Sequence, residues 1–250
     1  MPRLVRCCVL AHATSRGNLW LLPLPADTII ETNLLGQGEP PLGPWRVERL
    51  ANVVDLVRKH VGTPDGRAPV LAVDGRSSSG KTSLARRIQQ AIPGATTIHT
   101  DDVAWWHSCF DWADLLAGGV LEPLRGGRSV AYRPPAWDER GRPGAIEVPA
   151  IAELVIVEGV GAGRRELTDL LDGVVWVQAN PEVTRRRDVA RIAAGEIDEE
   201  SYVRWMQEEE PFVADQRPWE RAFAVVAGTS ELPFDATTEV VLGTPQVLAA

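Results

Sequence analysis

With 250 residues, of which 44% are hydrophobic and 24% charged, the chain can bury a substantial core and is expected to form one globular domain with additions. Its 34 acidic residues outnumber 26 basic ones, which argues against a nucleic-acid-binding face. No apolar run is long enough to span a membrane, and Cys7, Cys8 and Cys109 suit neither a disulfide framework nor a paired metal motif. We therefore expect a cytoplasmic protein that binds neither nucleic acid nor membrane; assembly into a homo-oligomer stays open.

The N-terminal part of the chain gives the weakest structural signal. Prolines and glycines repeatedly interrupt the apolar residues before position 45, which predicts irregular structure. Between Val47 and Val61, valine and leucine then recur at helical spacing, which predicts a helix that ends near Gly62. Residues 1–62 are accordingly predicted to be an N-terminal extension with one helix.

A glycine- and serine-rich segment follows the apolar run 69–73 and precedes an amphipathic helical pattern. It reads Gly-Arg-Ser-Ser-Ser-Gly-Lys-Thr from Gly75 to Thr82 and fits a phosphate-binding loop at every fixed position. A flexible linker is the alternative, but a linker is not expected between a buried strand and a helix. Backbone N–H groups of such a loop point at phosphate oxygens. The predicted nucleotide-binding residues are Gly75, Ser77, Ser78, Ser79, Gly80, Lys81, Thr82 and Ser83.

Further along, apolar runs alternate with helical patterns. Besides 69–73, the expected strands are 95–99, 154–157, 174–178 and 222–227. Continuous apolar strands separated by helices indicate a parallel sheet that is covered on both faces. The fold class is therefore α/β, a three-layer sandwich with a five-stranded parallel sheet, and its ligand is expected at the carboxyl ends of the strands.

Carboxylates stand where two of these strands end. Asp101 and Asp102 follow the second strand, and Glu158 follows the third. Transfer of a phosphoryl group to an alcohol needs a carboxylate that orients the hydroxyl and accepts its proton, and Asp101 is placed for this role. We expect Thr82, Asp102 and Glu158 to hold Mg²⁺, with Glu158 also close to the substrate. The alternatives are a helix-capping turn for the aspartates and a solvated turn for Glu158.

Beyond the fourth strand, Asn180 begins a helical segment that is rich in arginine. Arg187 and Arg191 share one face of that helix and could close over a nucleotide as a catalytic lid. A solvated basic face is the alternative.

The stretch between the second and third strands has a different character. Residues 129–132 and 145–148 could pair as a hairpin around 139–144. Its aromatic and charged side chains suit a planar, polyhydroxylated substrate, although each tryptophan could equally serve packing. The substrate candidates from this stretch are Trp105, Tyr132, Arg133 and Trp137.

In order and spacing, six of these segments resemble the uridine kinase family of P-loop kinases over roughly residues 68 to 230. The segments are 75–82, 99–102, 122–124, 132–138, 156–160 and 185–191. The resemblance implies a P-loop NTPase-type fold and transfer of the terminal phosphate of ATP, with Mg²⁺, to the 5′-hydroxyl of a nucleoside. It assigns the catalytic base to Asp101, the strand-end acid to Glu158 and the lid to Arg187 and Arg191. The lysine of the phosphate-binding loop itself, Lys81, is the expected catalytic phosphate lysine.

The same resemblance implies a domain organisation. A kinase domain would span 63–235, with a substrate hairpin at about 120–150 and a lid at about 182–200, followed by a C-terminal tail at 236–250. The segment 133–137 lacks clear equivalents of the aromatic and histidine residues that hold the pyrimidine in typical uridine kinases. The acceptor therefore stays open between a nucleoside and another hydroxylated metabolite or natural product, as does the choice between ATP and GTP.

Two other classes of protein also contain a phosphate-binding loop, namely GTPase switches and regulatory nucleotide-binding modules. A GTPase switch needs an Asn-Lys-x-Asp motif, and the only lysines, Lys59 and Lys81, do not occur in one. A regulatory nucleotide-binding module would keep the loop without needing a base, and the presence of Asp101 and Glu158 argues against it.

Overall fold

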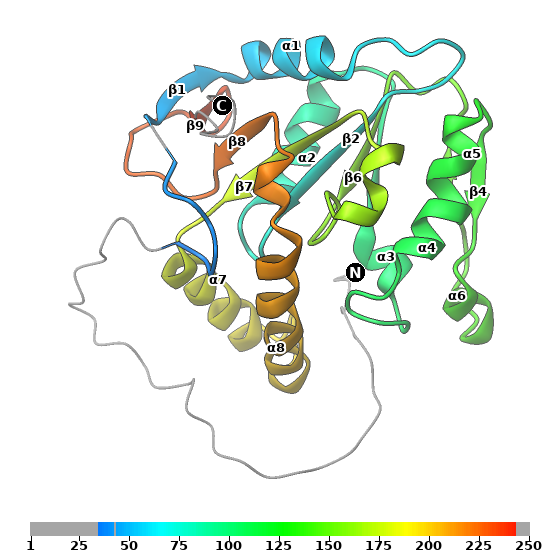
Figure 1. The fold of residues 1–250 in the computed structure, drawn as a ribbon. Helices are drawn as coiled ribbons and strands as arrows, with labels where there is room; N and C mark the ends of the chain where they lie inside the picture. Colours follow the sequence, from blue (N-terminus) through cyan, green and yellow to red (C-terminus); the bar gives the residue numbers. More distant parts are fainter. Residues whose placement is uncertain (1–34, 43, 244–250) are drawn as a thin grey trace.

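A seven-stranded sheet forms the centre of the protein in the computed structural model, which describes residues 35–42 and 44–243. The strand order is β1-β9-β8-β7-β2-β6-β3 (Figure 1). The strands are β1 (Arg46–Arg49), β2 (Val70–Gly75), β3 (Ala95–His99), β6 (Leu154–Glu158), β7 (Gly173–Gln178), β8 (Ala224–Ala227) and β9 (Glu239–Gly243). The five strands from β8 to β3 run parallel, as the apolar runs predict. The sequence did not indicate β1 and β9, which extend one edge in antiparallel pairs.

The sheet is covered on both faces because successive side chains of its central strands point to opposite sides. Leu71 and Val73 of β2 pack with apolar residues of α1 (Leu50–Val61) and α2 (Lys81–Ala91). Val70 and Ala72 face the other layer. That layer draws on α3 (Thr100–Ala104), α4 (Ala113–Leu116), the π-helix η1 (Ala117–Leu121), α5 (Glu122–Arg125), and the 3-10 helices η2 (Arg165–Leu170) and η3 (Pro218–Glu220). The expected three-layer α/β sandwich is confirmed.

The ends of the described chain are part of this sheet, which changes the expected organisation. Residues 236–250 were predicted to be a tail, yet β9 pairs with both β8 and β1. Likewise, β1 and α1 belong to the sheet and its covering layer, although 1–62 was predicted to be an extension. β1 is an edge strand whose residues are mostly exposed, so it has no apolar run. β9 lies inside the sheet, but its apolar run, 240–242, is only three residues long. Residues 1–34 of the predicted extension lie outside the described residues.

The segment between β3 and β6 contains the predicted hairpin. β4 (Val130–Tyr132) pairs antiparallel with β5 (Ile146–Val148), with Val130 opposite Val148. A short helix, α6 (Pro135–Glu139), occupies part of the connection, where only a turn was expected. Pro135 in the first turn of α6 favours the start of a helix. The prediction from the sequence covered only the two flanking strands and therefore did not include this helix.

Two helices lie at the carboxyl ends of the parallel strands and extend away from the sheet (Figure 1). They are α7 (Pro181–Ala193), within the predicted lid, and α8 (Glu199–Gln216). Asn180 caps α7 by accepting the N–H of Glu182, and Asp198 caps α8 by accepting the N–H of Ser201. None of the helices described here combines the length and apolarity that crossing a bilayer would require.

Candidate active site

The phosphate-binding loop lies where the sequence predicts it, between the end of β2 and the start of α2. A Cβ atom at Gly75 would lie 2.6 Å from Oγ of Ser79 and 2.8 Å from the backbone oxygen of Val177, so only glycine fits there. Gly80, with φ of 100°, adopts a left-handed conformation that favours glycine. The loop therefore leads directly into the N-terminus of α2, whose free N–H groups favour an anion.

A cavity of about 710 Å³ opens beside this loop. Its walls include Lys81 and Thr82 of α2, Asp101 of α3 and Glu158 of β6. It continues along α2 past Arg86 to Phe234 and Val241, near the ends of β8 and β9. Its volume is within the range of small-molecule and cofactor sites. The parallel sheet thus brings Lys81 and Glu158, which are 77 positions apart in the sequence, to one cavity.

Glu158 joins two other side chains at the carboxyl ends of the strands. Its Oε1 accepts the hydroxyl of Thr82 at 3.0 Å, and its Oε2 lies 2.7 Å from Nδ1 of His99. Burial alone would raise the pKa of Glu158, but the hydrogen bonds from His99 and Thr82 and the charge of Lys81 hold it below its ordinary value. The same bond raises the pKa of His99. Glu158 is only 4% exposed, so a solvated turn does not describe it.

Asp101 lines the cavity and is exposed at its wall. Desolvation raises its pKa, and the charge of Lys81 partly opposes that shift. A carboxylate with a raised pKa is a better proton acceptor than an ordinary aspartate. The position of Asp101 therefore agrees with the expected base.

Asp102 was expected to bind the metal, but the structure places it elsewhere. Its Oδ1 lies 2.5 Å from a guanidinium nitrogen of Arg142, and its backbone oxygen accepts the indole N–H of Trp137 at 2.8 Å. The two aspartates lie on α3, so their side chains diverge by the helical angle and not by the alternation of a strand. Asp102 thus holds the hairpin region and does not line the cavity.

The substrate candidates from the hairpin region do not line the cavity either. Arg133 binds Asp138 at 2.6 Å and the backbone oxygen of Arg142 at 3.0 Å. Trp137 is buried, and the guanidinium of Arg142 lies 3.7 Å from its ring centre. Tyr132 packs against Gly119, and Trp105 lies 5.1 Å from the same guanidinium. These side chains hold the segment together, which is the packing alternative.

Both lid arginines line the cavity. Arg187 donates to the backbone oxygens of Ser78, at 2.8 Å, and Gly228, at 3.1 Å. Arg191 pairs with Glu196 at 3.3 Å. The face that helical spacing assigned to these residues therefore points at the phosphate loop.

Several residues of the site were not identified from the sequence. Asp74, at the end of β2, is fully buried and accepts the backbone N–H groups of Gly75 at 2.7 Å, Gly161 at 2.9 Å and Gly163 at 2.8 Å. Burial raises its pKa to about 6. It thereby joins the start of the phosphate loop to the loop after β6. The signal was an acidic residue inside an otherwise apolar strand, which is costly to bury without partners.

Two further carboxylates, those of Asp188 and Glu209, lie at the tip of the phosphate loop, and the sequence did not indicate them either. In the sequence they stand among many other charged residues of α7 and α8. Only the packing of these helices distinguishes them from solvated neighbours.

The residues present fit a magnesium ion. The hydroxyl of Thr82 and the carboxylate of Glu158 are oxygen ligands of the kind that Mg²⁺ prefers. Among the described residues, no three His, Cys, Asp or Glu side chains form a group that could hold a metal ion. An ion here would therefore depend on phosphate oxygens for further ligands, which is usual for Mg²⁺ with nucleotides.

A buried parallel strand, a glycine-bounded loop and a helix N-terminus follow one another at the carboxyl end of the central strand β2, which is the arrangement of a phosphate-binding loop in an α/β fold. No family model matches the sequence, and no curated protein matches it. The fold is similar to that of a possible uridine kinase from Bacillus stearothermophilus, with 18% identity and a TM-score of 0.45 over 70% of this chain and 98% of that one. It is also similar to a candidate fructose transport system kinase from Silicibacter sp. TM1040, with 18% identity and a TM-score of 0.44 over 67% and 92% of the two chains.

Proposed function

We propose that this protein is an ATP-dependent kinase that transfers the γ-phosphate to a hydroxyl group of a nucleoside or nucleoside-like acceptor. The observation that carries the proposal is that Asp101 and the phosphate-loop residue Lys81 line the same cavity. A loop that binds phosphate and a carboxylate that can accept a proton are the two parts that phosphoryl transfer to an alcohol requires.

We propose a role for each of these side chains. Asp101 accepts the proton of the acceptor hydroxyl while the hydroxyl oxygen of the acceptor bonds to the γ-phosphorus. The bond between the γ-phosphorus and the β–γ bridging oxygen breaks, which releases ADP. Lys81 compensates the charge of the transferring group, and the lid arginines Arg187 and Arg191 can add to this compensation. Thr82 and Glu158 would hold Mg²⁺, which neutralises phosphate charge when it is bound.

A second acceptor class is favoured by one observation. The aromatic side chains that suggested a planar substrate, Trp105 and Trp137, contact Arg142 and do not line the cavity. A hydroxylated acceptor without an aromatic ring, such as a sugar, would not need them. The alternative to the nucleoside is therefore a kinase for another hydroxylated metabolite or natural product.

The test is ADP release with Mg²⁺ and ATP, or GTP, over a panel of nucleosides, sugars and hydroxylated natural products. Acceptor-dependent turnover that is lost in Lys81→Ala and in Asp101→Asn is expected. Lys81→Ala should cost several kcal/mol at the transition state, about a thousandfold in rate. Nucleotide binding without turnover on any acceptor would instead favour a regulatory nucleotide-binding module, and unchanged turnover in Lys81→Ala would refute the assignment of the loop.

A further inference from the structure

Helix α8 reaches the phosphate loop through a buried carboxylate. Oε1 of Glu209 accepts the backbone N–H of Ser77 at 2.9 Å, and its Oε2 accepts the hydroxyl of Ser77 at 2.6 Å. The indole N–H of Trp205, one turn earlier on α8, also donates to this carboxylate and lies 2.7 Å from the hydroxyl of Ser77. Glu209 is 0% exposed, so its negative charge is compensated by these donors and not by water.

Helix α7 contacts the next residue of the same loop. Asp188 accepts the hydroxyl of Ser78 and is 3% exposed, while Arg187 donates to the backbone oxygen of Ser78. Arg191 gives Asp188 only partial compensation, because its guanidinium is 4.0 Å away and its side chain is partly exposed. Two buried carboxylates from two helices thus meet at consecutive residues of one phosphate-binding loop.

The backbone donors of this loop and the helix that follows it favour anions, and here two carboxylates of the protein already interact with the loop. A polyphosphate in the loop would bring several negative charges close to Asp188 and Glu209, where little water is present to screen them. The two carboxylates and the phosphate also depend on the same source of positive potential, namely the loop N–H groups, the N-terminus of α2 and Lys81. Their interactions therefore oppose each other.

We infer that Asp188 and Glu209 form an acidic latch, which holds α7 and α8 on the phosphate loop and which a bound nucleotide has to displace. Release of the latch would free Arg187 from the backbone oxygens of Ser78 and Gly228, so that its guanidinium becomes available to phosphate. The latch would thus couple binding of the polyphosphate to the arrangement of the lid. The inference rests on the nucleotide-binding part of the proposed function and not on phosphoryl transfer.

The opposite role is also physically reasonable and makes the inference testable. If Glu209 instead positions the loop for the nucleotide, removal of its charge should weaken binding. If Glu209 is part of a latch, replacement by glutamine removes its repulsion of the polyphosphate. The same replacement also weakens the hydrogen bonds that hold α8 on the phosphate loop. Both losses then favour the nucleotide, so the two roles predict effects of opposite sign.

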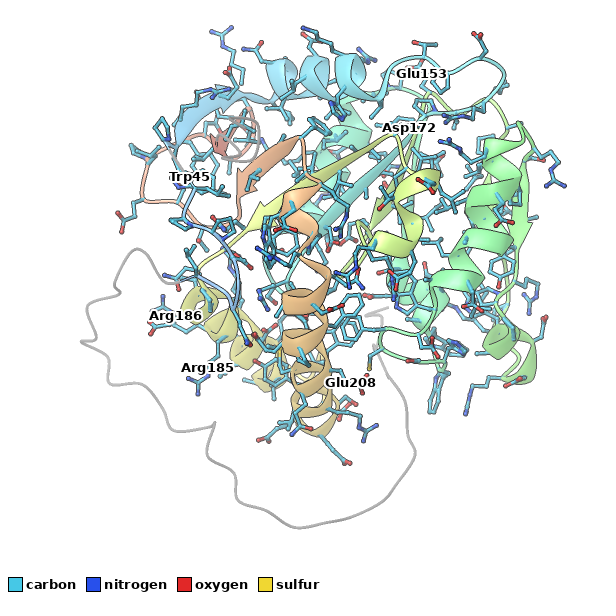
Figure 2. All side chains as sticks on the ribbon, in the orientation of Figure 1. Trp45, Glu153, Asp172, Arg185, Arg186 and Glu208 are labelled. Carbon is cyan, nitrogen blue, oxygen red and sulfur yellow. The ribbon has the colours of Figure 1, made fainter. Side chains whose placement is uncertain are left out.

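The experiment is isothermal titration of the full chain with ATP and Mg²⁺, and separately with inorganic tripolyphosphate. Glu209→Gln and Asp188→Asn should each tighten binding by about tenfold, as expected for removal of one poorly screened like charge. The matched control is Glu208→Gln, which removes an exposed charge from the adjacent position of α8 (Figure 2) and should leave affinity within about twofold.

Hydrogen exchange of the unaltered protein provides a second measurement that does not depend on how the variants fold. Saturating tripolyphosphate should accelerate amide exchange within 199–216, because α8 loses its contact with Ser77. Weaker or unchanged binding in both variants, or slower exchange in α8, would overturn the latch. Tighter binding in the variants without turnover on any acceptor would leave the latch in place and count against the kinase, so the two failures are distinguishable.

Discussion

The hydroxyl of Thr82 donates to Oε1 of Glu158 at 3.0 Å and thereby joins the first turn of α2 to the carboxyl end of β6. The second carboxylate oxygen of Glu158 is held by His99, at the end of β3. The three strand and helix ends that surround the cavity are therefore linked through one buried carboxylate. This linkage gives Glu158 a fixed orientation before any ion or nucleotide binds.

Glu158→Gln is expected to raise the Mg²⁺ concentration that half-saturates turnover by about tenfold, because the amide keeps the shape but loses the charge. The measurement is ADP release over a magnesium titration at saturating ATP. Glu153→Gln is the matched control, since Glu153 immediately precedes the same strand at its opposite end and is largely exposed (Figure 2). An equal magnesium dependence in both variants would contradict the role of Glu158.

Asp101→Asn should lower kcat by roughly two to four orders of magnitude while ATP affinity stays nearly intact, because the amide cannot accept the proton. Steady-state kinetics combined with nucleotide titration would measure both quantities. Asp102→Asn is the comparison. Its expected effect is a loss of about 1 kcal/mol of unfolding free energy, since Arg142 would lose a charged partner, with little change in magnesium dependence. The reverse pattern would assign the base to Asp102.

Arg187→Ala and Arg191→Ala should each reduce kcat by at least about tenfold and leave the melting temperature nearly unchanged. Both side chains are substantially exposed, so they contribute little to stability, while their charges can stabilise the transferring phosphate. Arg186→Ala is the control, because Arg186 is exposed and points away from the body of the protein (Figure 2). A lower melting temperature with normal turnover would favour the solvated basic face.

Asp74 should make stability depend on pH in the acid range. Burial raises its pKa in the folded state to about 6, above the value of about 3.9 in an unfolded chain, so the folded protein holds the proton more tightly. Its contribution to stability is therefore full below about pH 4 and is lost as the pH rises through 6. The shift corresponds to about 3 kcal/mol.

Urea unfolding of the protein and of Asp74→Asn between pH 4 and 7 would test this dependence. Relative to the variant, the unaltered protein should lose stability as the pH rises, since asparagine does not titrate. A constant difference between the two proteins over this range would show that the three backbone N–H bonds fully offset the burial of the charge.

The sequence by itself determined the parallel part of the sheet and the phosphate loop. Both depend on local signals, namely continuous apolar runs in strands buried on two faces and glycines at fixed spacing. The strand β1 lacks such a run because it borders the sheet and needs fewer apolar residues, and β9 inside the sheet has a run of only three, 240–242. The pairing of β1 with β9 depends on segments that lie far apart in the chain. These two strands are recognised only in the structure, where residues 46–49 pair with residues 239–242.

The candidate site divides in the same way. Lys81, Asp101 and Glu158 could be chosen from the sequence because parallel strands present their carboxyl ends at one edge. Whether Asp102 faced the cavity or Arg142, and whether Trp137 stacked on a substrate or on an arginine, depended on how the inserted segment packs against α3. The same holds for Glu209, which differs from its exposed neighbour Glu208 only in the direction its side chain takes from α8. Side-chain partners of this kind are set by contacts between distant segments, and a local pattern contains no information about them.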